Sequence, residues 1–224
     1  MEFQKLSDRI YYLPYMKETD RPVLGYIKGD KYSLMVDAGN SSNHVSLYNY
    51  SLEKLGLSSP DYVVITHWHW DHTFGMCAVE GKLIANRLTN NQLEKMSSWI
   101  WTDEAMKERL QIGEEIEFCD TCIRLEYPNR REIKVRTADI VFDESLTIDL
   151  GGIHCELIHI GGPHSDDSVA VYIAEEKVLF IGDADCEDYY YNNGQYNKNK
   201  LEKFIESLKA IDFQTYIIGH DMPQ

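Results

Sequence analysis

The chain has 224 residues, of which 43% are hydrophobic, and this is enough apolar material for one folded domain with its own core. Its 37 acidic residues outnumber the 22 basic ones and give a net charge of −15. This charge disfavours nucleic acid and anionic membranes as partners, because both are bound through basic surface. We expect a single domain over residues 1–224 that acts on a small-molecule substrate.

The start of the sequence shows no basic stretch followed by an apolar one, so it predicts no secretory signal. No run approaches the ~18 apolar residues that a membrane span needs. The five cysteines, an odd number, are scattered and favour free thiols in a reducing compartment. We therefore expect a cytoplasmic protein. The sequence leaves the oligomeric state open, with a homodimer as one alternative.

The first third of the chain predicts short strands separated by turn signals and one helix. After the helix, which Gly56 ends, comes a fully apolar run typical of a buried strand. Strands are expected at 10–13, 23–27, 32–36, 62–65 and 82–85, a helix at 43–55, and one or two helical turns at 73–79.

The pattern changes between residues 86 and 140, where helices are expected at 89–101 and 103–112 and the remainder shows no clear period. We interpret this stretch as a helical insertion over the domain. Cys119 and Cys122 lie within it. Two thiols cannot complete a four-ligand zinc site, so we expect no metal there.

The last third repeats the order of the first, with strands followed by an amphipathic helix and a final strand. Strands are expected at 146–150, 153–160, 169–173, 178–181 and 216–218, and the helix at 199–211. Two similar halves of this kind predict two sheets packed face to face with helices outside. The predicted fold class is therefore α/β, a four-layer αββα sandwich.

Directly after the apolar run at 62–65, three imidazoles and a carboxylate fall within six residues: His67, His69, Asp71 and His72. Histidine is the commonest metal ligand, and a carboxylate completes a donor set suited to zinc, iron or manganese. Two tryptophans, Trp68 and Trp70, alternate with these residues. The cluster predicts a metal site at the end of a strand.

Three further strand ends carry residues of the same type. His164 follows Gly161, Gly162 and Pro163, and Asp183 and His220 each follow a strand and a glycine. Strands that emerge at one edge of a sandwich would bring these loops to the cluster. The remaining histidines, His44, His154 and His159, do not fit this pattern and are not expected to be ligands.

These motifs resemble those of the metallo-β-lactamase-fold hydrolases, in order and over nearly the whole chain except residues 86–140. The resemblance implies that His67, His69 and His164 bind one metal ion, that Asp71, His72 and His220 bind a second, and that Asp183 bridges the two. It also implies that Asp37, in an Asp-x-Gly turn, orients the ligand loop from behind.

The resemblance implies a dinuclear metal-dependent hydrolase that cleaves an ester, thioester, lactone or amide. The attacking group would be a hydroxide held between two divalent metal ions. The ions are most simply zinc, with iron or manganese as alternatives. Asp71 is the candidate for proton handling. The alternatives are a mononuclear iron enzyme resembling persulfide dioxygenases and a non-catalytic metal-binding module. The aspartate at 183 disfavours β-lactamase activity, and the acidic charge disfavours ribonuclease activity.

The substrate is expected to lie near aromatic side chains around the cluster. Trp68 and Trp70 are candidates for lining the substrate mouth, with packing as the equal alternative. Tyr189 and Tyr190 follow Asp183 closely, and a phenol there could donate a hydrogen bond to a developing oxyanion.

Overall fold

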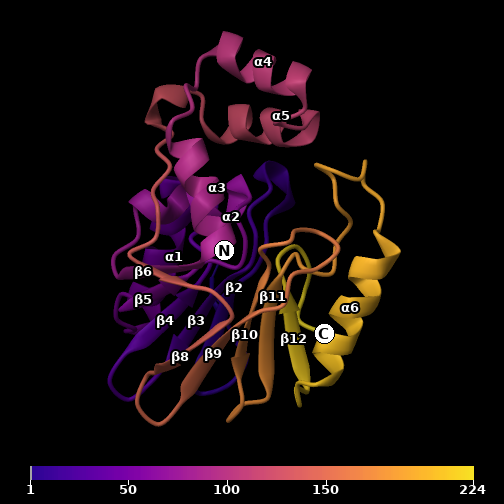
Figure 1. Cartoon of the computed structure of the whole chain (residues 1–224). Helices are drawn as coiled ribbons and strands as arrows, with labels where there is room; N and C mark the ends of the chain where they lie inside the picture. Colours follow the sequence, from indigo (N-terminus) through magenta and orange to yellow (C-terminus); the bar gives the residue numbers. More distant parts are fainter. Residues whose placement is uncertain (1) are drawn as a thin grey trace.

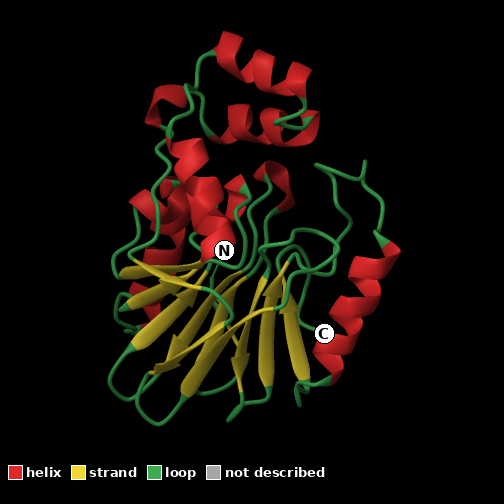
Figure 2. Ribbon diagram, viewed as in Figure 1, coloured by secondary structure: helices red, strands yellow, loops and turns green. Residues whose placement is uncertain are grey.

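The computed structural model describes residues 2–224 and contains two β-sheets packed face to face (Figures 1 and 2). The first sheet has seven strands in sequential order, antiparallel from β1 to β4 and parallel from β4 to β7. Its strands are β1 (Gln4–Lys5), β2 (Ile10–Leu13), β3 (Leu24–Lys28), β4 (Ser33–Val36), β5 (Tyr62–Val64), β6 (Lys82–Asn86) and β7 (Ile140–Phe142).

The second sheet has five strands in the order β12-β11-β10-β9-β8, all antiparallel except the β11–β12 pair. The parallel pair requires a crossover, which a helix provides. The strands are β8 (Ser145–Asp149), β9 (His154–His159), β10 (Val169–Ile173), β11 (Val178–Gly182) and β12 (Thr215–Ile218).

Helices cover the outer faces of both sheets and complete the four layers, which confirms the predicted αββα sandwich (Figure 2). Within the described part of the chain, no helix is long and apolar enough to cross a bilayer. The α-helices are α1 (Ser42–Leu55), α2 (Trp70–Thr73), α3 (Arg87–Ser97), α4 (Asp103–Ile112), α5 (Glu117–Glu126) and α6 (Lys198–Lys209), and the 3-10 turns are η1 (Lys17–Thr19), η2 (Phe74–Cys77) and η3 (Arg130–Glu132).

Three apolar clusters hold these layers together. Between the sheets, side chains such as Val64 and Phe180 interdigitate. Tyr48 of α1 and Leu93 of α3 are buried in a second cluster against the outer face of the first sheet. Phe204 of α6 fills the corresponding place on the second sheet. Alternate residues of each strand thus face opposite clusters, as the period of two requires.

The helical stretch between β6, which ends at Asn86, and β7, which begins at Ile140, occupies the range 86–140 that the sequence predicted, but not all of it stands clear of the first sheet. Helix α3 packs on the first sheet, and β7 extends that sheet beside β6. Only α4, α5 and η3 rise above the sandwich (Figure 1). Their own core, which includes Met106 and Ile123, continues into Trp68 and Trp70 of the histidine cluster. The insertion is therefore packed directly against the metal-ligand candidates.

Polar contacts also fix the insertion to the first sheet. Arg21, in the loop between β2 and β3, forms a 2.7 Å ion pair with Glu126 at the end of α5. The hydroxyl of Tyr127 donates a 3.0 Å hydrogen bond to the Asn40 carbonyl. These groups are largely buried, so the insertion packs closely against the β2–β3 loop.

Candidate metal centre

The histidine cluster occupies the turn between β5 and the short helix α2. His67 and His69 lie in the turn, and Asp71 and His72 lie within α2. All four side chains are buried, with exposed fractions of 7% or less. The Thr73 hydroxyl donates a 2.9 Å hydrogen bond to the His69 carbonyl and closes the turn. The apolar packing of Trp70 against Phe74 holds the turn from below.

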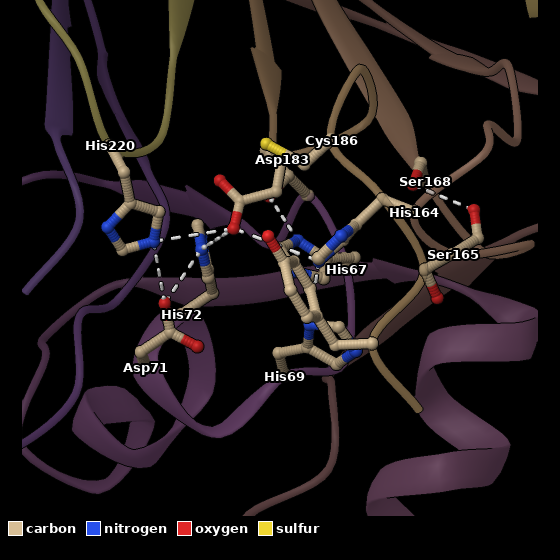
Figure 3. A network of polar contacts seen from close by, with 12 residues as sticks. His67, His69, Asp71, His72, His164, Ser165, Ser168, Asp183, Cys186 and His220 are labelled. Atoms are coloured by element: carbon tan, nitrogen blue, oxygen red, sulfur yellow. Dashed lines mark hydrogen bonds and ion pairs between the residues drawn. The ribbon is translucent and has the colours of Figure 1, made fainter. Parts of the chain in front are cut away.

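The other three candidate ligands reach the cluster from the second sheet. His164 comes from the loop between β9 and β10, Asp183 directly follows β11, and His220 follows β12. Figure 3 shows their side chains pointing toward those of the cluster. The structure thus brings together at one edge of the sandwich all seven side chains that the sequence placed at strand ends.

The first ligand group consists of His67, His69 and His164. The Nδ1 of His164 lies 2.7 Å from the Glu187 carbonyl, to which it donates, so its Nε2 is left for the site. This Nε2 lies 2.9 Å from Nδ1 of His69. Burial lowers the pKa of both His67 and His69, which keeps these imidazoles in the neutral form that binds metal.

The second ligand group consists of Asp71, His72, Asp183 and His220. Oδ2 of Asp71 lies 3.1 Å from Nε2 of both histidines. Burial opposes protonation of His72 and His220, yet the Asp71 and Asp183 carboxylates raise the pKa of both well above the usual value. The group therefore attracts positive charge, which protons or a metal ion can supply.

Asp183 lies between the two groups. Its Oδ2 is 3.4 Å from Nε2 of His72, 3.3 Å from Nε2 of His220 and 3.8 Å from Nε2 of His164. Gly219 packs against the same carboxylate, and a Cβ at this position would overlap with Oδ1 of Asp183. The glycine before His220 is therefore required by the approach of the β12 backbone to Asp183.

Two carboxylates contact ligand histidines at the ring nitrogen that faces away from the site. Asp37, at a positive φ of 61°, accepts hydrogen bonds from the Thr66 backbone N–H at 2.7 Å and from Nδ1 of His72 at 2.8 Å. These contacts direct Nε2 of His72 into the site. Asp20 of the β2–β3 loop lies 3.6 Å from Nδ1 of His220. Burial, with Asp71 nearby, raises the pKa of Asp20 to about 7.

The residues fit metal ions. Each group offers three or four nitrogen or oxygen ligand atoms within 4.8 Å of one another. Nε2 of His67 and Oδ1 of Asp183 are buried and, among the described residues, have no hydrogen-bond partner. Unpaired buried polar atoms of this kind are costly, and a metal ion would satisfy them. The mixed imidazole and carboxylate set suits zinc, iron or manganese.

A cavity of about 440 Å³ opens above the two ligand groups. Tyr189 and Tyr190 line it, as the sequence suggested. Trp68 and Trp70 are not among the described residues that line it; both belong to the apolar core of the insertion, and Trp70 is only 1% exposed. Trp70 is therefore a packing residue. Trp68 is 6% exposed and also lines a smaller pocket beside His164, so its place at the substrate mouth stays a prediction.

The Tyr190 phenol is already engaged. Its hydroxyl donates a 2.8 Å hydrogen bond to Glu115, and its ring lies 4.8 Å from the His69 ring between centroids. Tyr190 thus contacts a ligand histidine and links it to the insertion, and its role as an oxyanion donor stays a prediction.

Five further lining residues were not among the site residues expected from the sequence: Asp20, Ile116, Phe118, Cys119 and Cys186. Ile116 is the residue before α5, and Phe118 and Cys119 lie in its first turn. No motif marks these three, because their place depends on how the insertion folds over the site. His44, His154 and His159 lie outside both ligand groups, and His44 is fully buried near the start of α1.

A four-layer αββα sandwich with histidine and aspartate groups at one edge of its sheets defines a metallohydrolase-type fold. The family profile of the Metallo-beta-lactamase superfamily matches residues 23–220, and the chain belongs to this superfamily. A comparison with curated protein sequences gives no match.

Several solved structures share the fold. A metallo-beta-lactamase from Pontibacter korlensis has 19% identity and a TM-score of 0.67, and the match covers 99% of this chain and 92% of that one. A metallo-beta-lactamase family protein from Thermus thermophilus has 18% identity and a TM-score of 0.66, covering 98% and 75%. A stereoselective inverting sec-alkylsulfatase from Pseudomonas sp. has 15% identity and a TM-score of 0.71, covering all of this chain but 38% of that one.

Proposed function

We propose that the protein is a hydrolase with two metal ions that cleaves an ester, thioester, lactone or amide. The observation that carries this proposal is the position of Asp183, whose Oδ2 lies within 3.8 Å of imidazole nitrogens from both ligand groups. A carboxylate so placed is suited to bridge two cations. His67, His69 and His164 would hold the first ion, and Asp71, His72 and His220 the second.

Bound zinc, the ion we favour, would polarise the substrate carbonyl and lower the pKa of a bound water. The protein's own residues fix the geometry. Asp37 and the Glu187 carbonyl each hold one ring nitrogen of a ligand histidine, so that the other ring nitrogen faces the site. Asp71 is the candidate to accept or return a proton, because its second oxygen is not held by either histidine.

A substrate panel tests the reaction class. The protein loaded with zinc, manganese or iron is assayed on p-nitrophenyl esters, thioesters, lactones, phosphodiesters and secondary alkyl sulfates. We expect turnover on carbonyl substrates. Stoichiometric metal without turnover on any substrate would instead indicate a metal-binding module, and one iron per chain with oxygen consumption on a persulfide would indicate the dioxygenase alternative.

A ligand variant tests the assignment of residues. His69→Ala removes an imidazole from the first group and is expected to lower the metal content and abolish turnover. His154→Ala is the matched control, because this exposed histidine pairs with Glu175 away from the site. Full activity and full metal content in His69→Ala would refute the ligand assignment.

A further inference from the structure

The walls of the cavity above the ligand groups are apolar and aromatic. Ile116, Phe118 and Cys119 contribute from the insertion, and Cys186, Tyr189 and Tyr190 contribute from the loop after β11. Phe118 is 59% exposed and so stands at the mouth. Apart from the Asp20 carboxyl and the hydroxyls and thiols of tyrosines and cysteines in the walls, the polar side chains that line the cavity belong to the two ligand groups at its floor.

Apart from the ligand histidines, the described residues that line the cavity offer a substrate no cationic side chain. Among the described residues that line it there is no lysine or arginine, and the only carboxyl outside the two ligand groups is that of Asp20. The arginines of the β2–β3 loop and of α5 have other partners. Arg21 pairs with Glu126 at 2.7 Å, and Arg124 of α5 pairs with Asp120 at 2.6 Å.

We propose that this cavity selects substrates whose non-reacting part is uncharged and apolar, such as an alkyl or aryl acyl group, and discriminates against substrates that carry an anionic group there. This inference rests on the proposed hydrolase function. An anionic tail would lose its hydration against Ile116 and Phe118 without gaining a partner, which is costly. An apolar tail gains free energy from the same burial.

The size of the cavity agrees with this class. Small-ligand sites typically measure about 300–1,000 Å³. At about 440 Å³ the cavity lies in the lower part of that range, enough for a short acyl chain or one ring. Asp20 strengthens the discrimination, because a carboxyl provides no positive charge in either protonation state. The reacting carbonyl, by contrast, lies at the floor, where the metal ions would supply the positive charge.

A matched pair of esters tests the proposal. p-Nitrophenyl hexanoate and mono-p-nitrophenyl adipate have the same length and differ only in a terminal methyl or carboxylate. With the zinc-loaded protein we expect kcat/KM to be at least about tenfold higher for the neutral ester, as expected when a buried polar group is left unpaired. Equal or higher kcat/KM for the adipate would overturn the inference.

A substitution at the mouth of the cavity tests the opposite change, in which a cation is added for the anionic tail. Phe118→Arg places a guanidinium beside the apolar wall and is expected to reduce the preference for the neutral ester about tenfold. Phe118→Leu, which keeps the wall apolar, is the matched control and should retain the preference. An unchanged preference in Phe118→Arg would show that the substrate tail does not reach this wall, contrary to the proposal.

A binding measurement separates this inference from the proposed reaction. Hexanophenone and 6-oxo-6-phenylhexanoate are ketones that cannot be hydrolysed and differ only at the chain end. Calorimetric titration of the zinc-loaded protein should give at least about tenfold tighter binding of the neutral ketone. Equal binding of both, or binding of neither, would overturn the inference. Discrimination between the ketones without hydrolysis of any ester would overturn only the proposed function.

Discussion

Glu115 is a buried carboxylate that links the insertion to the site, and its effect on stability can be predicted quantitatively. The side chain accepts hydrogen bonds from the Tyr190 hydroxyl at 2.8 Å and from the Ile116 backbone N–H at 2.9 Å. The residue is only 7% exposed. Burial outweighs these hydrogen bonds and raises the pKa of Glu115 from 4.5 to about 7.

The sign of the stability effect follows from this shift. Between pH 4.5 and about 7 the folded state binds more protons than the unfolded state, so stability falls as pH rises through this window. One pKa unit corresponds to about 1.4 kcal/mol, so the ionised carboxylate costs roughly 3 kcal/mol at pH 8 and less than about 1 kcal/mol at pH 5. Glu115→Gln removes this cost and keeps an oxygen for Tyr190.

Urea unfolding of chelator-treated protein from pH 5 to pH 8 measures the effect. We expect the free energy of unfolding of Glu115→Gln to be about 3 kcal/mol higher than that of the natural protein at pH 8, which corresponds to about 10 °C in Tm. At pH 5 the difference should be much smaller. Glu114→Gln, which loses an ion pair with Lys95 nearer the surface, controls for the removal of one negative charge. A difference between Glu115→Gln and the natural protein that stays constant with pH would refute the argument.

The remaining predictions concern the metal ligands. Asp37→Ala is expected to weaken metal binding about 10- to 100-fold in competition with a chromogenic chelator, because His72 loses its orienting partner; Asp30→Ala, which removes a surface ion pair with Arg9, should not. Gly219→Ala should displace Asp183 and lower the metal-to-chain ratio, whereas Gly56→Ala, in open space at the end of α1, should leave that ratio unchanged. Chelation should lower the Tm, by roughly 10 °C when free metal exceeds Kd about a thousandfold, and added zinc should restore it; an unchanged Tm would contradict a metal-stabilised centre.

The sequence predicted the sandwich well, because its signals are local. The helix at 103–112 and the strands at 10–13 and 169–173 match the structure at both ends. Caps explain the helix: Thr102 accepts from the Ala105 backbone N–H, and Gly113 adopts a left-handed conformation. The candidate ligands were found for a similar reason, since each follows a strand whose end the apolar pattern marks.

The insertion was predicted less well, because its structure depends on tertiary packing. Helix α5 was missed: Cys119, Asp120, Thr121 and Cys122 all have low helix propensity, and burial of Cys119, Cys122 and Ile123 stabilises the helix instead. Strand β7 was missed because its three residues are too few to show the alternation of polar and apolar side chains that marks a strand. The apolar cavity wall and the burial of Trp70 depend on the same packing.

The central claim is that two groups of side chains bind two metal ions around Asp183. Elemental analysis of the purified protein, with the metal-to-chain ratio measured for the natural chain and for His69→Ala and His220→Ala, tests it most directly. We predict a ratio close to two for the natural chain and a loss of metal in each variant. A ratio near zero, or a ratio of one that His220→Ala leaves unchanged, would contradict it.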